Sequence, residues 1–140
     1  MRFVDVGIFL CAALENPKEH FKGCKSLLER LEAKAGKAKE KVCTTLLTPA
    51  VFYFILENRE GLSKEKLAKA ILSMRALNIT FFPLGDGGTM EEAARLAEKK
   101  ETDFGDALNA LVMRKKGIRE IYALDPHYDR FEWIKRVIPS

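Results

Sequence analysis

The chain has 140 residues, of which 47% are apolar and 31% charged, and its formal net charge is +4. A chain of this length and composition can bury a full hydrophobic core, so disorder is excluded and a single domain over residues 1–140 is expected. The mild positive charge suits an anionic partner such as nucleic acid, but a solvated surface rich in Lys and Glu explains it better.

The cysteines and the apolar stretches indicate in which cellular compartment the protein is found. Cys11, Cys24 and Cys43 are widely spaced and form no C-x-x-C motif, which argues against a disulfide framework and against a zinc site. We therefore expect a reducing, cytoplasmic environment. The longest apolar stretch, residues 46–56, is too short to span a bilayer, and the N-terminus has no signal-peptide pattern, so no membrane contact is expected.

Strand and helix patterns alternate along the chain. In chain order, we expect a strand at 2–5, helices at 9–14 and 17–35, a strand at 42–46, helices at 48–58 and 63–77, a strand at 79–82, helices at 89–100 and 103–116, and a strand at 119–124. A short helix and a final strand are expected within residues 131–138. This alternation predicts a mostly parallel sheet of four or five strands, covered on both faces as a three-layer α/β/α sandwich.

Three local patterns refine the predicted helices. Asn16 is expected to cap a helix that begins at Pro17, and Thr89 is expected to form a capping box with Glu92. The helix over residues 48–58 is apolar nearly all round, which predicts that it is buried on every side.

Aspartates gather where predicted elements end or begin. The chain has 14 Glu but six Asp, and the Glu residues are scattered along Lys-rich helical stretches as ordinary solvated charges. Asp5 ends the first apolar run, Asp125 ends the run at 119–124, and Asp103 and Asp106 open the helix between them. Ligands of an open parallel sheet gather outside the carboxyl ends of its strands, so we expect these four carboxylates to share one edge.

Crowded carboxylates point to a divalent cation. Such groups repel one another unless they are protonated or hold a cation, and oxygen-rich sites suit Mg²⁺ or Mn²⁺. These ions polarise a phosphoryl oxygen and lower the pKa of bound water, which favours attack on a phosphodiester. Singly, Asp103 and Asp106 are also explained as charges at a helix N-terminus and Asp125 as a turn residue, but together the four favour the metal site.

Three segments resemble motifs of the PIN-domain family. Residues 2–10 resemble its first motif, residues 104–110 resemble the segment where the family carries Asp-Ala ahead of an apolar helix, and residues 128–131 are similar to its D-x-x-F-D ending. The resemblance spans the chain in order. It implies a parallel sheet between helices and a Mg²⁺- or Mn²⁺-dependent ribonuclease. Many small members are the toxin of a VapBC-type toxin–antitoxin pair and dimerise, so RNA, an antitoxin protein and a second copy are the expected partners.

The resemblance also implies roles for particular residues. By position, Asp5 is the first metal-site acid, Asp106 the third and Asp125 the fourth, while Asp103 is a candidate to assist them. Asp129 belongs to the same tail but is less central.

Two positions depart from the family pattern. Gly7 stands where the family often has Asn, and Val51 stands where its second acid, usually Glu, is found. Glu57 is the nearest acid, but it lies six residues further along the helix and faces another direction. The departures favour a second hypothesis, a module of the same fold that has lost catalysis and binds RNA or a protein partner.

Other candidates are weaker. His127 lies near Asp125 and is a candidate contact for a substrate phosphate, although a loop histidine without a role is the more ordinary interpretation. The run 85–88 is typical of a turn, because it lacks the lysine of a phosphate-binding P-loop. A receiver-like signalling domain is not supported, since no adjacent acidic pair follows the first strand. Basic residues that could contact an RNA backbone are Lys34, Lys37, Lys39, Lys41, Arg114, Lys115 and Lys116.

Overall fold

The computed structural model describes residues 1–32 and 40–140. The predicted end of the second helix at 33–35, its stop at Gly36, and Lys34, Lys37 and Lys39 therefore lie outside the described residues. In chain order the elements are β1 (Arg2–Val4), α1 (Val6–Leu14), α2 (Lys18–Arg30), β2 (Val42–Thr45), α3 (Leu47–Asn58), α4 (Lys64–Arg75), β3 (Ile79–Phe82), α5 (Gly87–Lys100), α6 (Phe104–Lys116), β4 (Glu120–Tyr122), the 3₁₀ helix η2 (Pro126–Arg130) and β5 (Lys135–Val137).

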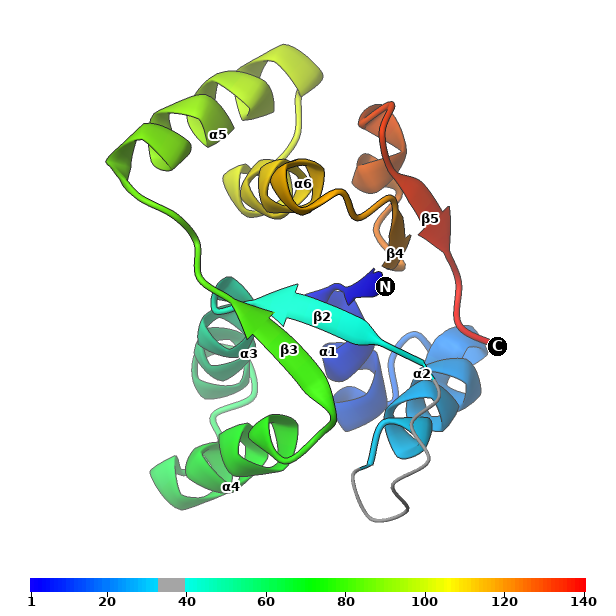
Figure 1. Cartoon of the computed structure of the whole chain (residues 1–140). Coiled ribbons are helices and arrows are strands. Elements are labelled where there is room, and N and C mark those ends of the chain that lie inside the picture. Colours follow the sequence, from blue (N-terminus) through cyan, green and yellow to red (C-terminus); the bar gives the residue numbers. More distant parts are fainter. Residues whose placement is uncertain (33–39) are drawn as a thin grey trace.

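All five strands form one parallel sheet in the order β3-β2-β1-β4-β5. Helices α1 to α4 cover one face, and α5, α6 and η2 cover the other (Figure 1). The predicted three-layer α/β/α architecture with a parallel sheet is thus confirmed. Because the chain proceeds outward from β1 first through β2 and β3 and later through β4 and β5, the order reverses between β1 and β4. Open α/β sheets bind their ligands at such a switch point.

Hydrophobic residues of β1 divide between two cores, one on each face. Val4 packs into a cluster with residues of α1 to α4, whereas Phe3 packs with residues of α6 and η2. Both side chains are fully buried. A strand covered on both faces needs apolar residues at successive positions, which explains the unbroken Phe-Val run that precedes Asp5.

Helix α2 begins one residue later than predicted and helix α5 two residues earlier, because their N-terminal caps differ from the expected ones. Pro17, not Asn16, is the N-cap of α2, and no side chain caps this helix. The capping box of α5 joins Asp86 and Thr89 rather than Thr89 and Glu92. The Asp86 carboxylate accepts the Thr89 N–H at 3.1 Å, and the Thr89 hydroxyl accepts the Asp86 N–H at 3.4 Å. The shorter Asp side chain thereby takes the cap that was expected from threonine.

Helix α3 is buried on one stripe only, contrary to the expectation of burial all round. Thr48, Phe52 and Leu56, spaced four residues apart, face the interior, while Phe54 is 64% exposed. The helix belongs to an outer layer, so the side of it that faces away from the sheet has no covering layer. The short C-terminal helix also lies earlier than expected, at 126–130, where Asp125 caps it and Pro126 starts it. In the described part of the chain, no helix combines the length and hydropathy needed to cross a bilayer.

Candidate metal centre

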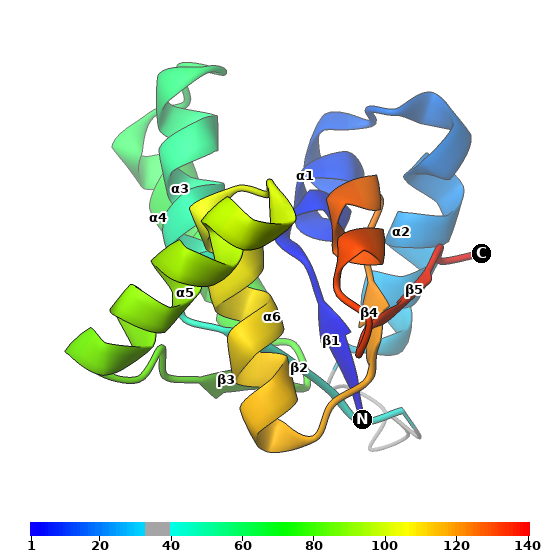
Figure 2. The same ribbon diagram turned by 90° about the horizontal axis from the view of Figure 1, so that it is seen from above.

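The carboxyl ends of β1 and β4 open into a pocket of about 660 Å³. The first turns of α1 and α6 and the helix η2 converge there (Figure 2). Asp5, Asp103, Asp106 and Asp125 all line this pocket, as the sequence predicted. Apolar side chains also line the pocket, among them Leu10, Leu47, Val51 and Leu124. Among the described residues that line it, none is Lys or Arg, so no fixed cation neutralises the four acids.

Asp5 is the most buried of these acids, with 5% of its surface exposed. It follows β1 directly and caps α1, because its Oδ2 accepts the Gly7 N–H at 3.1 Å. For this reason α1 begins at Val6, three residues earlier than predicted. Its Oδ1 accepts the Tyr128 hydroxyl at 2.9 Å. Burial, and to a lesser degree the charge of Asp125, raises the pKa of the Asp5 carboxyl.

A buried hydrogen-bond chain stands behind Asp5. The Thr45 hydroxyl donates to Asn109 Oδ1 at 2.7 Å, and Asn109 Nδ2 donates to the Tyr128 oxygen at 3.3 Å. Because the Tyr128 oxygen already accepts from the amide, its own hydrogen is directed to Asp5. Sequence reasoning missed this chain. Its signal was present in the spacing, since Asn109 is a polar residue three positions after Asp106 on an otherwise apolar helix face.

Asp106 lies in the first turn of α6, and its side chain is 14% exposed. Burial first, and the charges of Asp5 and Asp125 in addition, raise the pKa of its carboxyl to about 8. Its Oδ2 is buried without a hydrogen-bond partner. A buried acceptor without a donor is costly, so this oxygen marks a place where a cation would be favourable.

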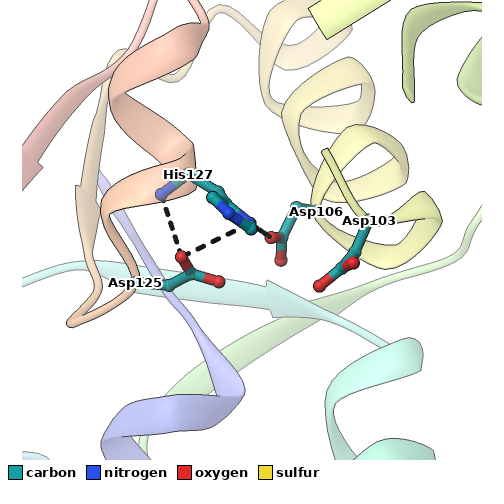
Figure 3. Close-up of side chains that lie close together, drawn as sticks. All are labelled: Asp103, Asp106, Asp125 and His127. Carbon is teal, nitrogen blue, oxygen red and sulfur yellow. Dashed lines mark hydrogen bonds and ion pairs between the residues drawn. The ribbon is translucent and has the colours of Figure 1, made fainter. Parts of the chain in front are cut away.

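Asp103, Asp125 and His127 complete the cluster (Figure 3). Asp103 is the N-cap residue of α6, but its side chain makes no capping hydrogen bond. Asp125 caps η2 by accepting the His127 N–H at 2.9 Å. The imidazole Nδ1 of His127 lies 3.8 Å from Asp106 Oδ2 and 3.7 Å from Asp125 Oδ1. One potential ligand atom from each of Asp103, Asp106, Asp125 and His127 lies within 4.8 Å of the others.

The donor set fits a divalent ion. Bonds of about 2.1 to 2.3 Å to oxygen or nitrogen bridge donors up to about 4.5 Å apart, close to the spacing of this group. Asp5 shares the pocket and its charge acts on Asp106, but it does not belong to this compact group among the described residues. Both of its oxygens already accept hydrogen bonds. The compact group of possible ligands therefore consists of His127 and the three acids Asp103, Asp106 and Asp125, and Asp5 lies outside it.

Neither Val51 nor Gly7, the two positions that depart from the PIN pattern, adds a charged group to the pocket. Val51 lines the pocket as part of its apolar wall, and Glu57 pairs with Lys64 instead of approaching the acids. At Gly7, a Cβ atom would lie 3.2 Å from Asp5 Oδ2, so the missing side chain leaves that oxygen uncrowded. Asp129 makes two hydrogen bonds of 3.0 Å to Arg136, which lower its pKa and hold it outside the cluster.

Comparison with known proteins places the fold. No family model and no curated protein matches the sequence. Among solved structures, the Mycobacterium tuberculosis toxin VapC20, described as cleaving the sarcin–ricin loop, matches with a TM-score of 0.75 and 22% identity over 99% of this chain and 100% of the toxin. Rickettsia felis VapBC2, solved bound to a promoter DNA fragment, matches with a TM-score of 0.65 and 13% identity over 97% of this chain and 96% of its own.

A third structure, PAE2754 from Pyrobaculum aerophilum, matches with a TM-score of 0.57 and 16% identity over 97% of this chain and 88% of its own. These similarities extend over nearly the whole chain. The protein therefore has a PIN-domain fold of the VapC type, which confirms the resemblance drawn from its motifs at the level of the fold.

Proposed function

We propose that the protein is a metal-dependent ribonuclease of PIN type that hydrolyses RNA phosphodiester bonds. The observation that carries this proposal is the convergence of Asp5, Asp103, Asp106 and Asp125 in one pocket without a neighbouring Lys or Arg among its described lining residues. The pKa of about 8 for Asp106 fits this arrangement, because burial and then the charges of Asp5 and Asp125 disfavour its ionised form in the absence of a cation.

Each acid has a distinct part in this proposal. Asp106 and Asp125 hold Mg²⁺ or Mn²⁺ with the help of Asp103, and Asp5 adds negative charge from the floor of the pocket. When bound, the ion polarises the scissile phosphate and promotes deprotonation of water. The Tyr128 hydroxyl holds the Asp5 carboxylate in place, so that Asp5 keeps its orientation as substrate and ion enter. Leu47 and Val51 line the same space with apolar surface.

The partners belong to the same proposal. The neighbours include a toxin that cleaves the sarcin–ricin loop and a VapBC pair, and we propose RNA as substrate and an antitoxin protein as partner of this chain. Exposed apolar side chains on the outer helices, Phe54 at 64% and Leu72 at 68%, offer surface for an antitoxin or a second copy. Cys11, Cys24 and Cys43 are free and buried, in keeping with the cytoplasmic location proposed from the sequence.

Val51 favours one alternative function. A carboxylate at this position would extend the acidic cluster across the pocket, whereas valine leaves that wall apolar. A module of the same fold that binds RNA or a protein without cleaving it is therefore the second candidate. The two hypotheses differ in ion uptake and in cleavage, and both properties are measurable on the purified chain.

The test combines calorimetry with an RNA cleavage assay. Mn²⁺ is titrated into the wild-type chain and into Asp5→Asn, Asp106→Asn and Asp129→Asn, and each protein is incubated with a mixed RNA pool. We expect the wild type and Asp129→Asn to bind the ion and cleave, because Asp129 lies outside the pocket. Asp106→Asn and Asp5→Asn should lose cleavage. RNA binding by a wild type that takes up no ion would establish the binding module instead.

A further inference from the structure

His127 has a ring nitrogen that hydrogen bonding does not explain. Its Nδ1 is buried and has no hydrogen-bond partner. The nearest carboxylate oxygens, on Asp106 and Asp125, lie 3.8 and 3.7 Å away. An N–H···O bond spans about 2.7 to 3.2 Å, so neither contact is one. A buried imidazole nitrogen without a partner carries a desolvation cost comparable to that of other orphaned polar atoms.

Asp106 also has a buried side-chain atom without a hydrogen-bond partner. Its Oδ2, the atom nearest His127 Nδ1, is the other buried atom of the Asp103, Asp106, Asp125 and His127 cluster that has no hydrogen-bond partner among the described residues. The ring and both carboxylates point toward a common space (Figure 3). His127 Nδ1 and Asp106 Oδ2 lie 3.8 Å apart and form no hydrogen bond. This spacing suits two ligand atoms that bind the same ion.

The backbone fixes His127 in this position. The His127 N–H donates to Asp125 Oδ1 at 2.9 Å, and Pro126 fixes the start of the 3₁₀ turn that carries both residues. Tyr128, the next residue, is fully buried and bound to Asp5. The backbone of His127 is thus fixed by its bond to Asp125 and by the buried Tyr128 beside it, which limits where the imidazole can lie.

We propose that His127 Nδ1 is a ligand of the divalent ion held by Asp103, Asp106 and Asp125, and that it makes the site favour Mn²⁺ over Mg²⁺. The histidine supplies the additional donor that Val51 does not. Mg²⁺ is held almost entirely by oxygen, whereas imidazole nitrogen strengthens binding of the later first-row ions. This inference rests on the metal site of the proposed function and adds to it a specific ligand and an ion preference.

The experiment measures ion affinity, not activity. Mn²⁺ and Mg²⁺ are titrated separately, by calorimetry, into the wild type, His127→Ala, His127→Asn and the control His20→Ala, which removes the other histidine of the chain. In parallel, the imidazole ¹⁵N resonances are recorded with and without Zn²⁺, a diamagnetic probe of nitrogen coordination. We expect His127→Ala to weaken Mn²⁺ binding by about tenfold or more and Mg²⁺ binding by less than about threefold.

His127→Asn should fall between the wild type and His127→Ala in its preference for Mn²⁺. His20→Ala should match the wild type. Zn²⁺ should shift the Nδ1 resonance of His127 and leave that of His20 unchanged. An unchanged Mn²⁺-to-Mg²⁺ ratio in His127→Ala overturns the ligand role while leaving the proposed function intact. Equal tightening of both ions in that variant overturns it as well, because it identifies His127 as a competing cation. Absence of ion uptake by the wild type overturns both proposals.

Discussion

Replacing Asp106 with Asn should stabilise the ion-free protein, and increasingly so as pH rises. The Asp106 carboxyl has a pKa of about 8 in the folded chain against an ordinary value of 3.8. Because the folded pKa is raised, the folded state keeps a proton that the unfolded chain has released between these two values. Stability therefore falls as pH rises through this window and levels off above about pH 8. Asn cannot ionise, so the variant lacks this loss.

The magnitude follows from the same two values. Inside the window each pH unit costs about 1.4 kcal/mol, which bounds the loss between about pH 6 and pH 8 at about 2 to 3 kcal/mol. Asp5, whose pKa is also raised by burial, acts in the same direction in both proteins. The difference between wild type and variant gives the contribution of Asp106 together with its coupling to Asp5.

Urea denaturation followed by circular dichroism provides the assay. Wild type and Asp106→Asn are unfolded in the presence of a chelator at about pH 6, 7 and 8, and the free energies of unfolding are compared at each pH. The wild type should lose about 2 kcal/mol relative to the variant across this range. In a parallel series without the chelator, Mn²⁺ at about a hundredfold its dissociation constant should raise the free energy of unfolding of the wild type by about 2.7 kcal/mol. The free energy of unfolding of Asp106→Asn should not change. Parallel pH profiles for the two proteins would refute the raised pKa of Asp106, which follows from its burial beside Asp5 and Asp125.

Three further substitutions test other parts of the structure. Tyr128→Phe removes the donor to Asp5 and should cost about 1 to 3 kcal/mol in urea denaturation, and an unchanged midpoint would contradict the buried hydrogen-bond chain. Val51→Glu adds a carboxylate to the apolar wall of the pocket and should tighten Mg²⁺ binding by about tenfold in calorimetry, worth about 1.4 kcal/mol; weaker binding would show that this wall does not reach the ion. Gly23→Ala would place a Cβ 2.2 Å from the Pro139 carbonyl oxygen, so we expect a loss of about 1 to 3 kcal/mol by the same denaturation assay.

The fold followed from periodicity because the inner strands β1, β2 and β4 are largely buried on both faces. Phe3 and Val4 contact opposite cores, so the strand is read as an unbroken apolar run, and the intervening helices require parallel strands. Helix ends were less predictable. Asp86 and Thr89 both have capping side chains, and only the backbone path decides which of them caps the helix.

The acids of the site could be predicted, whereas the residues that support them could not. Asp5 and Asp125 end buried runs, and the carboxyl ends of parallel strands meet at one edge. The spacing of Asn109 after Asp106 marks it as a polar residue of the site, but its bond to Tyr128 depends on how η2 packs against α6, a tertiary contact that periodicity does not reveal. The sequence favoured a loop histidine without a role at His127. Its approach to Asp106 depends on the turn at Pro126, which the sequence pattern does not reveal.

Anomalous diffraction from crystals soaked in Mn²⁺ provides the most direct test of a divalent-ion site at this sheet edge. We predict one strong manganese peak enclosed by the side chains of Asp103, Asp106, Asp125 and His127, absent from crystals of Asp106→Asn. A pocket that stays free of manganese at saturating concentration, or a peak that persists unchanged in the variant, would contradict the account.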